Sequence, residues 1–172
     1  MEKTKLPSAA LALVAAAIFC AGPVRQGEAQ RAVPVLAVAE IHYVDTSGEV
    51  IDQSAEHRRR LRAFEAALRS DLVASGKMAN TALECPPNAC SVGDLNDAQL
   101  LDKAKEAGAT HLLIGRFHKM STLIQQAKFD IIDVKARKMV FDRYITFRGD
   151  NDAAWRHAES FVVRQILDHG EW

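Results

Sequence analysis

The chain has 172 residues, of which 48% are apolar, and its 22 Lys and Arg residues balance its 22 Asp and Glu residues at pH 7. A chain without net charge has no overall attraction to nucleic acid or to an anionic membrane surface, so neither is expected as a partner. The length suits a short leader followed by one domain that is large enough for a substantial hydrophobic core.

Residues 1–29 have the pattern of a secretory signal peptide. Lys3 and Lys5 provide a positive start, an apolar run covers residues 6–22, and residues 27–29 (Gly-Glu-Ala) place small side chains at the two positions that a signal peptidase recognises. The apolar run is shorter than the about 20 residues that a membrane-spanning helix needs. We therefore expect cleavage after residue 29 rather than a transmembrane anchor.

Cleavage would release residues 30–172 into the periplasm of a bacterium as a single α/β domain. Lipidation at Cys20 is not expected, because Phe19 stands where a lipoprotein signal requires a small residue. No later run is apolar enough to cross a membrane, so we expect no stable membrane insertion after cleavage.

Two cysteines, Cys85 and Cys90, remain in the exported part, separated by two prolines, an asparagine and an alanine. An even number of cysteines in an exported chain indicates a disulfide. A redox pair usually has two intervening residues, and a zinc site needs two more ligands at suitable spacing. We therefore expect a structural disulfide, with a redox pair or half of a zinc site as the alternatives.

The exported part begins with a strand and a helix. Residues 35–42 are apolar on both alternating faces, which is typical of a central strand, and turn residues follow at 45–48. Ser54 is a candidate N-cap for a helix that ends at Gly76. Its buried stripe is Leu61, Phe64, Leu68 and Leu72. Beside this stripe, we expect Arg58–Arg60 to lie on a solvent-exposed face; a contact surface for an anionic partner is the alternative.

A short strand is expected within residues 78–83, just before the cysteines. Asn96, with Gln99 in capping-box position, starts a second helix that Gly108 ends. Residues 111–115 are densely aliphatic and predict a buried strand.

Residues 122–133 and 139–148 alternate between apolar and polar side chains, which predicts two antiparallel strands with one covered face. Asp150 or Asn151 then caps a final helix. Its buried stripe is Trp155, Ala158, Val162 and Ile166. The fold class is therefore α/β: a layered sandwich in which three main helices pack on a mixed sheet of about five strands.

Three segments carry a family resemblance: Gly115–Ile124, Asp133–Val134 and Arg148–Trp155. They resemble a family of small exported bacterial proteins with a domain of unknown function, and the resemblance extends over roughly Ala32–Leu167. That family is similar in fold to the amino-terminal domain of TolB. The resemblance implies this fold and an exported location, and it implies no reaction. The sequence departs from the family pattern at Thr122, Ala154 and Lys135–Ala136.

Lys119 and Ser121 could form a base and a nucleophile, because alternate residues of a strand share a face. Such a pair would also need an oxyanion hole and a substrate cleft, and no further residues in the sequence supply them. We therefore expect a hydrogen-bonded bend or bulge here, with a hydrolase as the alternative.

The six histidines do not form a metal-binding motif with a nearby carboxylate, so we expect no metal and no cofactor. The alternative metal site joins His42 and His118, if their strands are neighbours, with Asp130 or Asp142.

The segment from Arg148 to Asp150 spells the adhesion tripeptide Arg-Gly-Asp, which often occurs by chance. We interpret it as structural: Gly149 permits a sharp turn, Arg148 pairs with Asp150 or Asp152, and Trp155 anchors the following helix. The alternative is a docking surface on which the indole of Trp155 is exposed.

No complete catalytic grouping is found in the sequence. We therefore expect a non-enzymatic periplasmic accessory or interaction module with a protein partner in the cell envelope. Its possible partner or ligand surface consists of Lys119, Ser121, Arg148, Asp150, Asp152 and Trp155. The alternative is a small-molecule or metal-binding periplasmic domain that uses the polar face of the sheet. That face would present His118, Lys128, Asp130 and Arg143.

Overall fold

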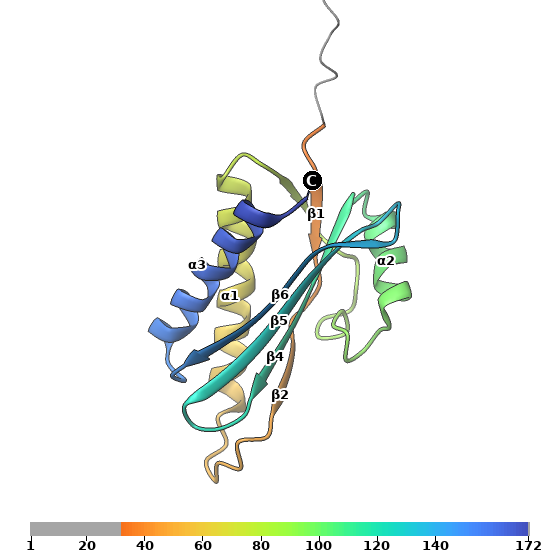
Figure 1. Cartoon of the computed structure of the whole chain (residues 1–172). Coiled ribbons are helices and arrows are strands. Elements are labelled where there is room, and N and C mark those ends of the chain that lie inside the picture. The colour runs from red at the N-terminus through yellow and green to blue at the C-terminus, as the bar shows by residue number, and fades with distance from the viewer. Residues whose placement is uncertain (1–31, 172) are drawn as a thin grey trace, which may run out of the picture. The chain divides into compact units, whose positions relative to one another are not determined.

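A computed structural model describes residues 32–171, so the expected signal peptide and its cleavage site lie outside the described residues. Six strands of the described part form one sheet, with helices on both of its faces (Figure 1). The elements in chain order are β1 (Val35–Val38), β2 (His42–Asp45), α1 (Ser54–Ala74), β3 (Ala79–Thr81), α2 (Asp97–Glu106), β4 (His111–Lys119), β5 (Ile124–Asp133), β6 (Lys138–Arg148) and α3 (Asp152–His169).

The sheet is mixed and has the strand order β3-β1-β4-β5-β6, with β2 paired to β4 beyond the end of β1. β1 is parallel to both β3 and β4, and β2 is also parallel to β4. The remaining pairs, β4 with β5 and β5 with β6, are antiparallel as the alternating segments predict. The expected fold class, a layered α/β sandwich with three helices, is confirmed.

The sixth strand arises because the first expected strand is broken in two. Val38 lies opposite Leu113 and His42 lies opposite Arg116, so one residue of the broken strand has no counterpart on β4. Two consecutive backbone amides at this bulge point away from β4: Glu40 N donates to Cys90 O at 3.1 Å and Ile41 N donates to Glu65 Oε1 at 2.7 Å. The apolar pattern of residues 35–42 does not reveal the bulge, because its partners lie far away in the sequence.

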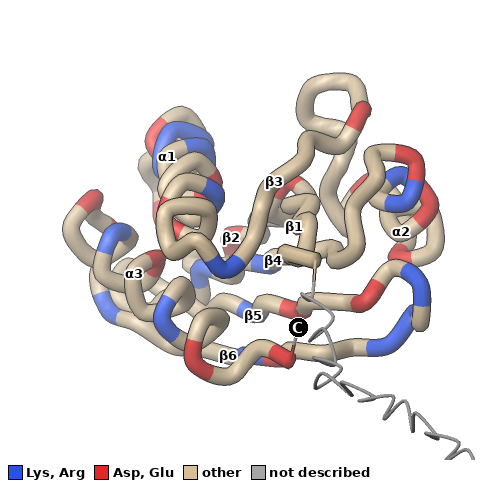
Figure 2. The backbone as a smooth tube through the Cα atoms, turned by 90° about the horizontal axis from the view of Figure 1, so that it is seen from above, with Lys and Arg blue, Asp and Glu red and all other residues tan. Residues whose placement is uncertain are grey.

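The two faces of the sheet carry separate cores, because successive side chains of a strand point to opposite sides. Leu113 and Phe117 of β4 face α1 and α3, whereas Leu112 and Ile114 face α2. Figure 2 shows the sheet between α1 and α3 on one side and α2 on the other. α2 is short, so it covers only part of its face.

Local capping signals position most helix ends correctly. Asn96 and Gln99 form the expected capping box, and Asn151 Oδ1 accepts from Ala154 N at 3.0 Å. Gly76 and Gly108 take the left-handed conformation expected after a helix C-terminus, with φ values of 70° and 72°.

The expected N-cap of α1 is wrong by one residue. Gln53, and not Ser54, is the N-cap, and it makes no side-chain capping bond. Its side-chain amide instead binds two charged residues: Nε2 donates to Glu49 Oε2 at 2.8 Å, and Oε1 accepts from Lys119 Nζ at 3.1 Å. A long-range polar contact has therefore taken the place of the local cap.

Cys85 and Cys90 form a disulfide, with Cα atoms 5.7 Å apart. The loop that they close is attached to the bulge between β1 and β2. The Glu40 carboxylate accepts from Asn88 N at 3.1 Å and from Cys90 N at 3.0 Å. The disulfide thus fixes a loop that lies beside the edge of the sheet.

Replacing both cysteines by serine should lower the free energy of unfolding by about 2 kcal/mol, because the closed loop is short and constrains the unfolded chain only modestly. Urea denaturation of the oxidised protein and of the double variant measures the difference. A thiol reductant should have the same effect on the wild-type protein and no effect on the variant. No loss of stability in either case would contradict a structural role for the bond.

Candidate functional site

The Lys119 side chain lies at the end of β4 and is completely buried, with 0% exposed. Its ammonium group is 2.8 Å from Asp150 Oδ2, forms a hydrogen bond with the Glu49 carboxylate, and donates to Gln53 Oε1 at 3.1 Å. Burial alone would lower the pKa of Lys119, but the hydrogen bonds and charges of Asp150 and Glu49 outweigh burial and raise that pKa. Lys119 is therefore a buried, fully paired cation.

Asp150 connects this cation to α1. Its Oδ2 atom is also 2.7 Å from His57 Nε2, and its Oδ1 atom accepts from Arg60 Nη1 at 2.9 Å. Burial would raise the pKa of Asp150, but the hydrogen bonds from Lys119 and His57 outweigh it, and the pKa is lowered. We call Glu49, His57, Arg60, Lys119 and Asp150 the Lys119 cluster.

Asp152 extends the cluster toward the surface. Arg59 and Arg60 donate to its carboxylate at 2.9 Å and 3.0 Å, and these hydrogen bonds lower the pKa of Asp152 to about 2. The arginine partners differ from the expected one, because Arg148 forms no ion pair within residues 32–171. Arg60 is also not solvent-exposed as expected: its side chain is only 13% exposed.

Trp155 lies beneath the Lys119 cluster in the apolar core. It is 3% exposed and stacks on Phe117, with ring centroids 4.8 Å apart. Tyr43 and His57 form a further ring contact at 4.9 Å above this pair. The indole of Trp155 is therefore an internal anchor of α3, and it is not presented to solvent.

Ser121 lies in the turn between β4 and β5, where its hydroxyl oxygen accepts from Ile124 N at 3.2 Å and from Leu123 N at 3.4 Å. This is the expected hydrogen-bonded bend. Because the raised pKa keeps Lys119 protonated, it is a poor general base for Ser121. The arrangement thus lacks the base that a hydrolase of this type would need.

The uncovered part of the α2 face carries the second candidate surface. The register places His42 and His118 on one side of the sheet, beside a shallow hollow of about 290 Å³. His118 Nε2 is hydrogen-bonded to Thr46 Oγ1 at 2.7 Å, and Asp130 is held by Arg116 and Lys128 at 3.1 Å each. Among the described residues, no group of three or more His, Cys, Asp or Glu is placed to hold a metal ion.

A groove along the free edge of β2 was not expected from the sequence. β2 pairs with β4 on one side, and no strand of residues 32–171 pairs with its other side, because β3 ends at Thr81 after covering only β1. Two adjoining hollows, of about 830 Å³ and about 400 Å³, follow this edge and share Tyr43, Arg58 and Leu61. We call them together the β2 groove. It is bordered by α1 and by the disulfide loop.

The carboxylates that border the β2 groove are used within the fold. Glu40 accepts from two amides of the disulfide loop, Glu65 accepts from Ile41 N, and Asp94 accepts from Ser91 N and Oγ. By contrast, Arg58 and Arg62 are exposed and form no hydrogen bond or salt bridge with the described residues. The groove therefore offers two free guanidinium groups. The only sequence signal for them was the four-residue spacing beside the α1 stripe.

Substituting Lys119 by methionine should cost about 3–5 kcal/mol of unfolding free energy, because it leaves the buried carboxylates of Asp150 and Glu49 without their cation. The matched control is Lys128→Met, which removes a partly exposed ion pair on the next strand and should cost about 0–1 kcal/mol. Urea denaturation measures both. Equal costs for the two variants would contradict a central role for the Lys119 cluster.

The lowered pKa of Asp150 makes part of the stability dependent on pH. A carboxylate whose pKa is lower in the folded state stabilises the fold above its unfolded pKa, about 3.9, and loses this contribution as the pH falls through the folded pKa. The stability difference between the wild-type protein and Asp150→Asn should therefore be constant near pH 7 and shrink below about pH 4. Denaturation at both pH values tests this, with Asp142→Asn as the exposed control. A difference that stays constant at low pH would show that Asp150 is not ionised in the fold.

No helix of residues 32–171 is both long and apolar enough to span a bilayer. No curated protein matches the chain. Among solved structures, TolB from Acinetobacter baumannii is similar over 80% of this chain, with 14% identity and a TM-score of 0.49. The chain spans 28% of the length of that TolB chain.

Two further solved structures are similar over most of their own length. The PelC dodecamer from Paraburkholderia phytofirmans has 17% identity, a TM-score of 0.47, and coverage of 81% of this chain and 89% of that chain. Lipoprotein GNA1162 from Neisseria meningitidis has 15% identity, a TM-score of 0.48, and coverage of 78% and 97%.

The family DUF3280, described as "Protein of unknown function (DUF2380)", has a model that matches residues 34–167. The matched range agrees with the extent of the resemblance expected from the sequence, and most of the chain lies within it. The chain belongs to this family.

Proposed function

We propose that this protein is a non-enzymatic accessory module of the bacterial cell envelope, and that it acts by binding another protein along the β2 groove. In this proposal, residues 1–29 direct export and are removed, and the domain that begins at residue 30 works in the periplasm. The disulfide between Cys85 and Cys90 suits an oxidising compartment.

The free edge of β2 is the observation that carries the proposal. An unpaired strand edge presents backbone donors and acceptors that readily pair with another chain, and proteins usually cover or blunt such edges. Here the edge lies beside a groove of about 830 Å³. A groove that leads to an unpaired strand edge is well suited to binding a segment of a second protein.

The charged residues with the most unusual environments support a structural role rather than a catalytic one. Perturbed pKa values often mark catalytic sites, but ion-pair networks that stabilise a fold perturb them as well. Lys119 and Asp150 neutralise each other within the fold, and Ser121 is hydrogen-bonded in a turn. These contacts favour a binding module over an enzyme.

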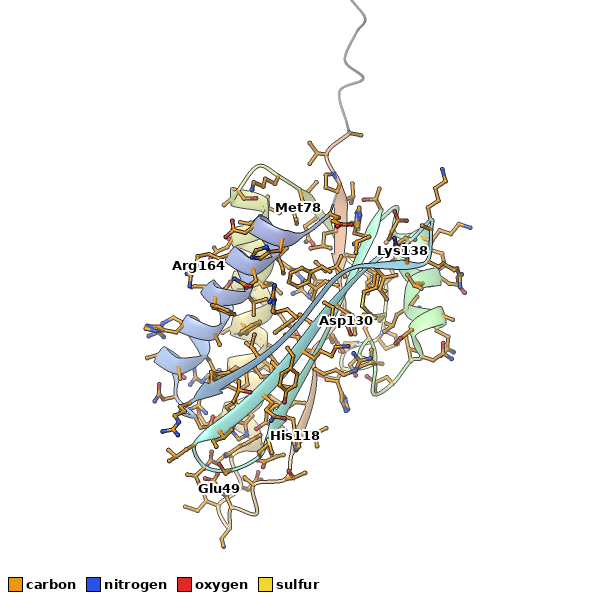
Figure 3. The ribbon with its side chains drawn as sticks, viewed as in Figure 1. Glu49, Met78, His118, Asp130, Lys138 and Arg164 are labelled. Atoms are coloured by element: carbon orange, nitrogen blue, oxygen red, sulfur yellow. A yellow bond between two sulfur atoms is a disulfide. The ribbon has the colours of Figure 1, made fainter. Side chains whose placement is uncertain are left out.

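Photo-crosslinking in living cells tests the proposal directly. Benzoylphenylalanine at position 62 places a crosslinker on α1 beside the groove, whereas position 164 places it on the exposed side of α3, where Figure 3 labels Arg164. We expect a discrete crosslinked product in the periplasmic extract from position 62 and none from position 164. Products from neither position, or equally from both, would contradict binding along the β2 groove.

A further inference from the structure

We propose that the β2 groove binds an extended, acidic segment of the partner protein, which pairs with β2 as an additional strand of the sheet. This inference rests on the proposed function and specifies the chemistry of its partner. Three features of the groove support it: the direction of the backbone groups of β2, the shape of the groove, and the two free arginines.

Backbone groups of β2 point into the groove. Thr46 N donates to Lys119 O of β4 at 2.9 Å, and the direction of the backbone groups alternates along a strand. The amides and carbonyls of Tyr43 and Asp45 therefore face away from β4, toward the free edge. A strand placed there could exchange hydrogen bonds with both residues.

Along the neighbouring part of the same edge, the protein satisfies such groups itself. Val38 O accepts from Arg69 Nη2 at 3.2 Å, Glu40 N donates to Cys90 O, and Ile41 N donates to Glu65. The described residues provide no comparable partner for the edge of β2, since β3 has already left the sheet. The unfilled length of the edge is therefore the length of β2 itself.

The groove has the shape that an added strand needs. Figure 2 shows α1 on one side of the sheet edge, with β3 and the loop after it on the other. Asn80 and Ala82, at the end of β3, border the larger hollow, and Asp45 borders the smaller one. A segment in the groove would therefore continue the line of β3 and pass along β2.

Arg58 and Arg62 favour acidic side chains at alternate positions of that segment. Residues four apart on a helix are about 6 Å apart along its axis, and alternate residues of a strand are about 6.6 Å apart. Two carboxylates on one face of the bound strand would thus match the spacing of the two guanidinium groups, which bind carboxylates well. Because the carboxylates of the groove are already hydrogen-bonded, they compete little for these arginines.

Tyr43 adds a polar group at the same place. Its hydroxyl oxygen is buried and has no hydrogen-bond partner among the described residues, and Tyr43 borders both hollows. Burial, together with the charges of Asp45 and Asp150, raises the pKa of Tyr43, so the hydroxyl remains a donor. A carbonyl or carboxylate of the bound segment could accept this hydrogen bond.

A second copy of the chain fits the groove less well. A symmetric dimer formed by two β2 edges would bring the same patch of each copy together. Arg58 and Arg62 would then face the same arginines of the second copy, and like charges would oppose association. PLACEHOLDER

Selection of random eight-residue peptides displayed on phage, with the purified protein as bait, tests the inference. Peptides enriched by the wild-type protein should carry Asp or Glu at alternate positions. The double variant Arg58→Glu/Arg62→Glu should lose this preference and enrich Lys or Arg instead, whereas Arg164→Glu, a charge reversal on α3, should leave the acidic preference unchanged. Enrichment without acidic residues, or an acidic preference that survives the double variant, would overturn the inference.

Hydrogen exchange then distinguishes strand addition from simple charge attraction. Binding of an enriched acidic peptide should slow exchange of the Tyr43 and Asp45 amides at least tenfold, and N-methylation of the peptide amides that face β2 should abolish the binding. Binding that survives N-methylation, with no change in the two amides, would overturn the added strand.

The two proposals fail in different ways. A crosslinked product from position 62, combined with no acidic preference in the selection, would leave the binding module intact and remove the acidic strand. The absence of both would remove the binding module as well.

Discussion

The buried ammonium group of Lys119 holds together parts of the chain that no backbone hydrogen bond connects. It lies at the end of β4 and pairs with Glu49 from the loop before α1 and with Asp150 from the turn before α3. A buried cation without partners would be severely destabilising, so both segments must remain in place for the fold to be stable. Asp150 then passes the constraint to α1 through His57 and Arg60. One end of the sheet is thereby fixed to both helices of its larger core.

Aromatic packing beneath the cluster completes this arrangement. Trp155 stacks on Phe117, and Phe64 of α1 meets Phe117 edge-on at 5.1 Å. Such contacts fix the position of α1 relative to β4, because close-packed rings do not slide without leaving cavities. Since α1 borders the β2 groove, the same contacts hold Arg58 and Arg62 at a fixed place beside the strand edge. The groove is thus rigid on its helical side and is fixed by the disulfide loop on the other.

Rigid surroundings make the free edge of β2 suitable for binding. An added strand loses conformational entropy on binding, and a preformed groove avoids a second such loss on the protein side. The edge is only as long as β2, and its flanks carry unpaired positive charge, so it disfavours pairing between identical chains. The same features that limit self-association leave the edge open to a partner of opposite charge.

The sequence alone determined the features that depend on neighbouring residues. The capping box at Asn96, the cap at Asn151, the glycines after α1 and α2, the antiparallel pair β5 and β6, and the short cysteine loop all follow from local geometry or strand periodicity. These signals repeat within a few residues and need no knowledge of distant parts of the chain. The family resemblance over the exported part belongs with them, because it too depends on local motifs.

Only the tertiary structure decided which charges meet and where the sheet is left open. Asp150 is 93 residues from His57 in sequence, and Arg60 rather than Arg148 is its arginine partner. The bulge between β1 and β2 depends on Glu65 and Cys90, and the groove exists because β3 is too short to cover β2. The physical reason is the same in each case: ion pairs, bulges and free edges are set by the packing of segments that are distant in sequence, and periodicity does not encode these contacts.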